Sequence, residues 1–172
     1  AIGAAENGCR TVLVDKGKVE SSGCLGGGND HFMAVLNTDP KTDSEQALVD
    51  FYKGPISGYT PEMISRWAQT MPVMLDVLQE IGVDLIKNPD GTFLRTVGFG
   101  QPGSWFININ KGQLIKRLLA KKVRAVGVDV IDHVMVTKLL TADNRVIGAV
   151  GYHVLDRSLF IFKAKSIILA LA

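Results

Sequence analysis

The chain is most constrained by a short apolar run, residues 11–14, that stands between a helix end and an acidic residue. Asn7 and Gly8 are typical of the residues that end a helix, so residues 1–8 read as its last turns. The β-branched run that follows is typical of a buried strand in a parallel sheet, and Asp15 comes directly after it. Helix, strand and acid in this order predict the second half of a β-α-β unit.

Asp15 stands where dinucleotide-binding folds carry the acid that accepts both hydroxyls of the adenosine ribose. In those folds the acid comes about 20 residues after the glycine-rich turn that holds the pyrophosphate. Counting back from Asp15 therefore places that turn upstream of residue 1, because Gly3 and Gly8 do not form it. The alternative is that Asp15 is a solvated carboxylate at the end of a strand.

A loop rich in small residues follows the strand, over residues 19–32. Its glycines allow main-chain amides to approach a ligand closely, and its hydroxyls can donate hydrogen bonds to phosphate or to ring heteroatoms. The alternative is a flexible connector. The small residues that could contact a ligand are Ser22, Gly23, Cys24, Gly27 and Gly28.

The middle of the chain is predicted to be mainly helical. Helices are expected over residues 43–53, 61–81 and 111–126. The first is expected to stop at Gly54 and Pro55, and the second to begin after Thr60 as its N-cap. Pro72 predicts a break or a kink in the second helix. Its core is expected to include three methionines, at positions 63, 71 and 74.

The last fifty residues are predicted to be β-rich. A meander is expected with strands over residues 128–140, 146–154 and 159–172, separated by turns. The final apolar run, residues 164–172, is expected to be a buried strand.

Two further side chains are candidates for a site. Trp105 lies in a segment, residues 97–106, that its glycines exclude from regular structure over most of its length. It either lines a ligand site or covers the core under a long loop. His133 is interpreted as structural, because no carboxylate or cysteine partner can be identified near it in the sequence. The spacing of the histidines and cysteines fits no metal site.

Composition excludes several classes of protein. With 47% apolar and 21% charged residues, the 172-residue chain is predicted to be globular rather than disordered. A net charge of +2 without runs of like charge favours neither nucleic acid nor an anionic membrane as a partner. Cys9 and Cys24 form no disulfide framework and fit a reducing, cytoplasmic compartment. No run reaches the roughly 18 to 20 apolar residues of a membrane span.

The order of these parts resembles the FAD-binding domain of one flavoprotein family. That family includes the fumarate reductase and succinate dehydrogenase flavoprotein subunits, and it is the adenylylsulfate reductase α subunit that the chain resembles most. The matching segments are residues 12–17, 22–28, 81–83, 127–140 and 164–170. The resemblance implies an α/β, Rossmann-like FAD-binding domain with a β-meander, from a two-electron oxidoreductase. It also implies that residues 1–172 are a partial domain, truncated at both ends, without the phosphate-binding turn and a downstream capping domain.

The resemblance implies roles for individual residues. Asp15 would bind the ribose, with Lys16 beside it, while Val134 would meet the adenine and Ala170 would face the cofactor. The pyrophosphate and flavin would lie along Ser22, Gly23, Cys24, Gly27 and Gly28. Trp105, and with less support His31, would face the substrate. The resemblance identifies no catalytic acid or base in this chain.

The nature of the FAD linkage and of the partners also follows from the resemblance. Members with covalent FAD have a histidine after the loop serine, where this chain has Gly23, so noncovalent FAD is implied. The implied partners are a small-molecule substrate and an iron-sulfur electron-transfer subunit. One departure is the end of the last strand, which reads Ala170-Leu171-Ala172 in place of the family's Ala-Thr-Gly-Gly.

Two alternatives remain open from the sequence. The same acid would serve an NAD-binding dehydrogenase domain, because the ribose is common to both cofactors. A non-catalytic domain could also retain this fold for contacts with a partner.

Overall fold

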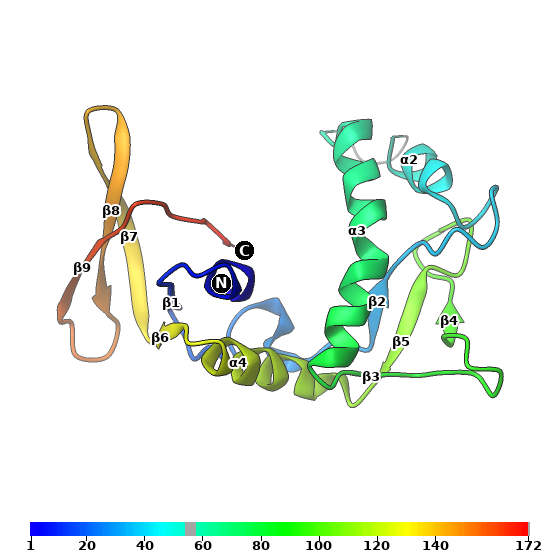
Figure 1. The fold of residues 1–172 in the computed structure, drawn as a ribbon, viewed down its shortest axis with the longest axis horizontal. Helices are drawn as coiled ribbons and strands as arrows, with labels where there is room; N and C mark the ends of the chain where they lie inside the picture. The colour runs from blue at the N-terminus through cyan, green and yellow to red at the C-terminus, as the bar shows by residue number, and fades with distance from the viewer. Residues whose placement is uncertain (54–57, 172) are drawn as a thin grey trace. The chain divides into compact units, whose positions relative to one another are not determined.

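The computed structural model describes residues 1–53 and 58–171, which form two compact units (Figure 1). Unit 1 contains Ala1–Gly28 and Lys116–Ala172, and unit 2 contains Asn29–Ile115. The chain therefore leaves unit 1 after its first strand and loop, and returns to it at the helix that precedes the second strand. Both units mix helices with strands, as predicted for an α/β chain.

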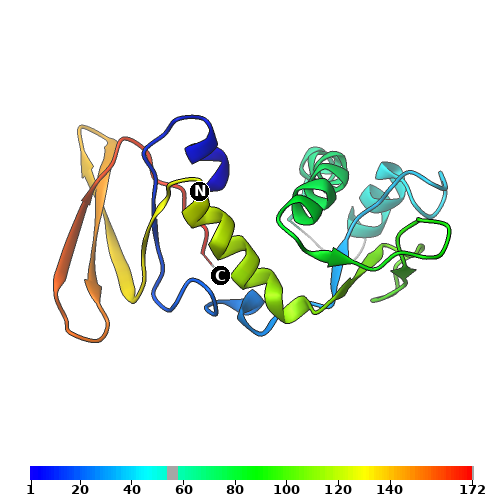
Figure 2. The same cartoon turned by 60° about the horizontal axis from the view of Figure 1, so that its bottom comes forward.

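Unit 1 contains the predicted helix, strand and acid. Its first elements are α1 (Ile2–Glu6) and β1 (Val12–Val14), and the later ones are α4 (Ile115–Ala125) and β6 (Asp129–Ile131). The strands β1 and β6 pair in parallel, with Leu13 opposite Val130. Helix α4 lies beside α1, where Lys122 Nζ is 2.8 Å from Glu6 Oε1 (Figure 2). A parallel pair connected through a helix is the arrangement expected of a β-α-β unit.

The second sheet of unit 1 is the predicted meander. Its antiparallel strands are β7 (Val134–Ala142), β8 (Arg145–His153) and β9 (Leu159–Lys163), in that order (Figure 1). The predicted strand over residues 128–140, however, is divided into β6, which pairs with β1, and β7, the first strand of the meander. Asp143 and Asn144 both have positive φ, as a tight hairpin turn requires. Gly148 and Gly151 are close to neighbouring backbone, and a Cβ at either position would overlap a carbonyl of the adjacent strand.

The predicted strand over residues 164–172 is wrong for the residues that the structure describes. Residues 164–171 form no strand, and Ala172 lies outside the described residues. Ile168 and Leu171 are 80% and 83% exposed. A strand requires the backbone groups of a neighbouring strand, and no described strand pairs with this segment beyond the bond from Ala164 N to the Ile147 carbonyl. An apolar sequence alone is therefore not sufficient to make it a strand.

Unit 2 is organised around one central strand. β5 (Phe106–Asn110) pairs antiparallel with β2 (His31–Met33), β3 (Asp84–Leu85) and β4 (Arg95–Thr96). Ile107 and Ile109 of β5 are buried. A turn at Asn88 lies between β3 and β4, where the Gly91 amide donates to the Asn88 carbonyl at 2.9 Å.

Two helices complete unit 2. These are α2 (Glu45–Lys53) and α3 (Pro61–Glu80), and the expected stop at Gly54 and Pro55 lies outside the described residues. Thr60 caps α3 as predicted, because its hydroxyl accepts a hydrogen bond from the Met63 amide at 3.3 Å. Pro72 lies inside α3 and does not end it. Figure 1 shows α3 as one continuous helix.

The predicted core face of α3 is partly wrong. Met71 is buried, but Met63 and Met74 are 56% and 40% exposed. The buried face recurs every three or four residues through Ile64, Ala68, Met71, Leu75 and Leu78. Met63 and Met74 fall outside that stripe, so helical periodicity decides their exposure rather than their apolar character.

A buried ion pair joins β4 to the segment that precedes α2 in unit 2. The Arg95 guanidinium donates two hydrogen bonds to the Asp43 carboxylate, at 2.8 and 2.9 Å, and a third to the Ala34 carbonyl at 3.1 Å. Asp43 also accepts from the Thr38 hydroxyl at 2.5 Å. Burial acts to raise the pKa of Asp43, but these hydrogen bonds outweigh burial and lower its pKa to about 2.

No helix in the described part of the chain is both long and apolar enough to cross a membrane.

Candidate functional site

The Asp15 carboxylate lies directly beyond the end of β1 and is held by its own loop. Oδ1 accepts a hydrogen bond from the Gly17 amide at 2.8 Å, and Oδ2 accepts one from the Ser22 hydroxyl at 2.5 Å. The side chain is neither fully buried nor fully exposed. Each carboxylate oxygen has more than one lone pair, so Asp15 retains acceptor capacity for a ligand.

Asp15 has a pKa below its ordinary value. Burial acts to raise the pKa, but the hydrogen bonds from Ser22 and Gly17 outweigh burial. Coulombic interactions with Lys116 and His133 also lower it. Asp15 is therefore an anion at neutral pH, and an anionic acceptor forms stronger hydrogen bonds with hydroxyl donors than a neutral one.

The small-residue loop after Asp15 contains a short 3-10 turn, η1 (Cys24–Gly27). Gly23 and Gly28, at its two ends, have φ of 70° and 99°, which favour glycine. A Cβ at Gly26 would overlap the Ser21 carbonyl. Gly23, Cys24 and Gly27 are exposed or partly exposed. The loop thus offers main chain without bulky side chains, which suits the close approach of a phosphate or of a ring.

The turn between β6 and β7, residues 132–133, lies against Asp15 and is called the corner below. The Asp15 amide donates to the Ile131 carbonyl at 3.0 Å, and the Val134 amide donates to the Asp15 carbonyl at 3.0 Å. The His133 amide donates to the Gly17 carbonyl at 2.9 Å. Val134 is buried. The structure therefore brings Asp15, Ser22 and Val134 together, although Val134 is more than a hundred positions from the other two.

Ion pairs and a hydrogen bond from charged side chains connect the loop to α4 and to the corner. Asp132 Oδ1 accepts from the Val19 amide at 2.8 Å, and Arg124 Nη1 is 2.7 Å from Glu20 Oε1. Arg124 Nη2 also lies 3.9 Å from Asp132. These contacts hold the start of the loop against α4 and Asp132, while the loop glycines remain accessible.

The proximity of two residues to Asp15 could not be predicted from local sequence patterns. Lys116 reads as part of a solvated helix face, and His133 reads as having no carboxylate partner, but both lie within electrostatic reach of Asp15. Their proximity depends on the pairing of β1 with β6. Both residues could be found from the sequence by asking which later segment pairs in parallel with the strand before Asp15.

Two of the predicted contact residues have no partner within this cluster. Lys16 is exposed beside Asp15, and Ala170 is exposed in the segment without regular structure. Their roles toward a cofactor stay predictions.

The two residues expected near a substrate belong to unit 2. The ring of His31 stacks on Phe106 at 3.9 Å, and its Nδ1 is 2.6 Å from Asp30 Oδ1. Trp105 has no exposed surface, and its indole N–H donates to the Thr42 carbonyl at 2.7 Å. Its ring also meets Phe51 edge-on at 5.5 Å. Trp105 packs in the core, the second of its two expected roles, and a role toward substrate stays a prediction.

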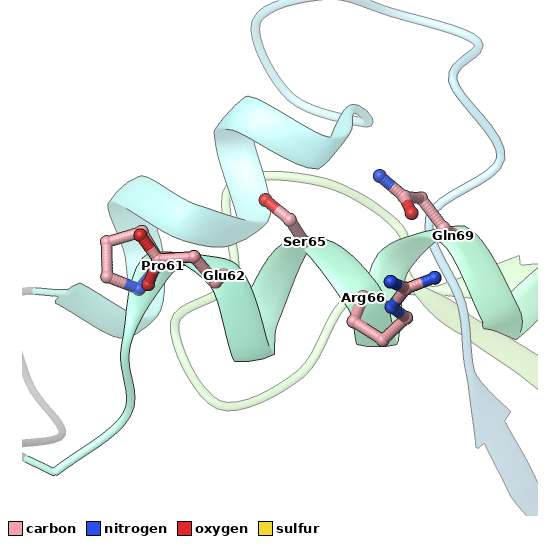
Figure 3. Close-up of a pocket in the computed structure, with 5 residues that line it drawn as sticks. All are labelled: Pro61, Glu62, Ser65, Arg66 and Gln69. Atoms are coloured by element: carbon pink, nitrogen blue, oxygen red, sulfur yellow. The ribbon is translucent and has the colours of Figure 1, made fainter.

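A shallow depression of about 290 Å³ lies on α3 of unit 2 (Figure 3). It is lined by Pro61, Glu62, Ser65, Arg66 and Gln69, all from one helix (Figure 3). None of the predicted site residues contributes to it. Within residues 1–53 and 58–171, no group of three or more histidine, cysteine, aspartate or glutamate side chains is arranged to hold a metal ion.

Comparison with known proteins adds a family and several relatives. The profile of the family described as FAD binding domain matches residues 1–171. One relative, from the fumarate reductase (CoM/CoB) of Methanothermobacter marburgensis, is 28% identical over 99% of this chain and 32% of its own length. The alpha chain of adenylylsulfate reductase from Megalodesulfovibrio gigas is 26% identical, over 94% of this chain and 26% of its own. The chain thus spans about a third or less of these relatives.

Solved structures give the same result for the fold. Adenylylsulfate reductase from Archaeoglobus fulgidus has a TM-score of 0.75 and 25% identity, covering 97% of this chain and 26% of that one. The Sdh1 complex of Mycobacterium smegmatis has a TM-score of 0.79 and 21% identity, covering 95% of this chain and 30% of that one. The second likeness concerns the fold alone.

Proposed function

Because the chain belongs to the FAD binding domain family, we propose that it is the FAD-binding portion of a two-electron oxidoreductase of the fumarate reductase, succinate dehydrogenase and adenylylsulfate reductase type. The family match favours FAD over NAD as the cofactor. The two relatives compared by sequence are named as subunits of such reductases. The activity and the substrate of the whole protein are proposals, because the chain spans a minor part of each relative.

The observation that carries the proposal is the setting of Asp15. An anionic carboxylate at the end of a parallel strand, beside an accessible glycine-rich loop, fits a ligand that offers both hydroxyl donors and phosphates. Lys116 adds a positive charge within electrostatic reach of Asp15. The donors and acceptors of unit 1 therefore fit an adenine dinucleotide.

We assign the cofactor contacts accordingly. Asp15 accepts the ribose hydroxyls, with Lys16 beside it, and the backbone at Val134 meets the adenine. The pyrophosphate and flavin run along the accessible loop of Ser22, Gly23, Cys24, Gly27 and Gly28. Ala170 faces the cofactor from the last described segment. His31, which is partly exposed, is the better candidate of the two for the substrate side, because Trp105 is fully buried.

The residues of this chain bind and orient the cofactor. When bound, FAD supplies two-electron chemistry at its isoalloxazine ring. Asp15 fixes the adenosine end through its charge, and the Ser22 hydroxyl that it holds at 2.5 Å is in position to shift toward a phosphate. The loop glycines allow the pyrophosphate to approach main-chain amides. Gly23 follows the loop serine in place of a histidine, which supports a noncovalent linkage.

Titration of FAD into the apoprotein tests the assignment of Asp15. Asp15→Ala is expected to weaken FAD binding about 10- to 100-fold, because hydrogen bonds to a charged acceptor are lost. Asp129→Asn is the matched control, since Asp129 is an exposed carboxylate of the partner strand β6. FAD affinity that is equal in wild type, Asp15→Ala and Asp129→Asn would contradict the proposal.

Acid precipitation tests the linkage. Flavin is expected to remain in the supernatant when the holoprotein is precipitated, because nothing in the proposed site attaches it covalently. Flavin colour in the pellet would overturn this part of the proposal.

An iron-sulfur electron-transfer subunit is the proposed partner. The names of both relatives identify them as subunits of larger assemblies. Purification of the native complex, followed by electron paramagnetic resonance after reduction, is expected to give the signal of an iron-sulfur cluster. A flavoprotein that purifies alone with full activity would contradict it.

A further inference from the structure

His133 stands at the corner where the chain leaves β6 and enters β7. Its backbone is left-handed, with φ of 61°. Few residues other than glycine adopt this conformation, although histidine is enriched among them. The turn directs the amides of His133 and Val134 toward the same neighbouring segment, at the Gly17 and Asp15 carbonyls.

These bonds fix the main chain of Asp15 from both sides. Its amide donates to Ile131, before the corner, and its carbonyl accepts from Val134, after the corner. The His133 carbonyl in turn accepts from the Val154 amide at 2.7 Å, which ties the corner to the end of β8. The main chain of Asp15, from which its side chain projects, is therefore held by residues on both sides of His133.

The imidazole ring has a separate contact. It meets the ring of His153 edge-on, with 6.0 Å between the ring centroids. His153 accepts a hydrogen bond from the Asp156 amide at 3.3 Å. The ring thus packs against the β8 end, whereas the bonds that hold Asp15 come from the backbone of the corner. A variant that keeps the left-handed backbone but loses the ring separates the effect of the ring from the effect of the backbone.

We propose that His133 is a positioning residue for the adenosine end of the cofactor, acting through its left-handed backbone on Asp15 and Val134. This inference rests on the proposed function, which places the ribose at Asp15 and the adenine at Val134. The left-handed corner holds the ribose acceptor and the adenine-facing backbone at a fixed separation. A residue that resists positive φ changes that separation without removing any group that touches the ligand.

Two substitutions in the full chain test the proposal, with ADP and FAD as probes in calorimetric titrations. ADP carries the adenine and ribose but no flavin. His133→Val, a β-branched residue that disfavours positive φ, is expected to weaken ADP and FAD by a similar factor, on the order of tenfold. His133→Asn retains left-handed geometry without the imidazole ring, and it is expected to stay within about twofold of wild type.

Asn144→Val is the matched control. Asn144 has a φ of 57° in the β7–β8 turn and is exposed, so valine introduces similar backbone strain away from Asp15. This variant is expected to lower the unfolding temperature and to leave both affinities unchanged. If His133→Val does not fold, His133→Ala gives the same comparison with less strain.

The outcomes separate the inference from the proposed function. Equal affinities of wild type and the folded His133 variant would overturn the inference, as would equal losses in His133→Val and Asn144→Val. A loss in His133→Asn as large as that in His133→Val would also overturn it, because the ring would then be the active group. Wild-type protein that includes the phosphate-binding turn expected upstream of residue 1 and that binds neither ADP nor FAD would instead contradict the proposed function itself.

Discussion

Unit 1 and unit 2 hold their strands in place with different kinds of interaction. Around β5 of unit 2, apolar side chains are buried, and the Asp43–Arg95 pair is nearly shielded from water. At the end of β1 in unit 1, backbone hydrogen bonds and partly exposed carboxylates hold the chain. Unit 1 also has a buried apolar core, but the polar network at the end of β1 is half-exposed, which leaves donors and acceptors available to a ligand.

Removal of the Asp43 charge is the strongest test of whether unit 2 depends on its buried ion pair. Asp43→Asn is expected to destabilise unit 2 by about 3–5 kcal/mol, because the buried Arg95 charge loses its partner. Both tryptophans, Trp67 and Trp105, lie in unit 2, so denaturant unfolding followed by tryptophan emission reports on this unit.

Asp39→Asn is the control for that experiment. Asp39 is an exposed acid close by in the sequence that accepts hydrogen bonds from the Lys41 and Thr42 amides. Its removal is expected to have a smaller effect than that of Asp43. Equal unfolding midpoints for Asp43→Asn and wild type would show that unit 2 does not depend on its buried pair.

Lowering the pH tests the Asp43–Arg95 pair without a mutation. The pKa of Asp43 is about 2 in the folded chain against 3.8 as its ordinary value. A depressed pKa stabilises the fold above the ordinary value, and this stability is lost as pH falls from about 4 through 2. The expected loss is about 2 kcal/mol, because each pKa unit corresponds to about 1.4 kcal/mol.

Denaturant midpoints measured by tryptophan emission at pH 5, 3 and 2 check this expectation. Asp43→Asn is the reference, since it lacks the titrating group and is expected to show a smaller change over the same interval. Parallel curves for the two proteins would assign the acid sensitivity to other carboxylates.

The smallest effect is expected in unit 1. Arg124→Gln removes a partly exposed contact with Glu20 and is expected to shift the unfolding midpoint only slightly, because water replaces much of the lost attraction. Hydrogen exchange of the amides over residues 18–23 is expected to become faster. A loss comparable to that of Asp43→Asn would show that unit 1 relies on its charges as strongly as unit 2 does.

Local signals predicted much of the fold. The cap at Thr60 and the meander from β7 to β9 depend on neighbours in sequence, and both are confirmed. The acid after the first strand lies at the strand end as expected, although its role toward a cofactor stays a prediction. The predicted final strand failed, because a strand also depends on a partner that composition does not reveal.

Long-range pairing explains what the sequence could not predict. Asp43 and Arg95 are 52 positions apart, and His133 comes near Asp15 through the pairing of β1 with β6. Nothing local distinguishes these residues from other charged or polar side chains. The exposure of Met63 has a different cause, because the helical periodicity of α3, a local signal, already places it outside the buried stripe.

The discontinuity of unit 1 has a consequence for the order of folding. Val12 pairs with Asp129, so β1 cannot find its partner until the intervening chain has been synthesised. Unit 2 is one continuous segment, and domains generally fold as units during synthesis. We expect unit 2 to fold first and thereby shorten the loop that β1 and β6 must close, which lowers the entropic cost of pairing these two strands.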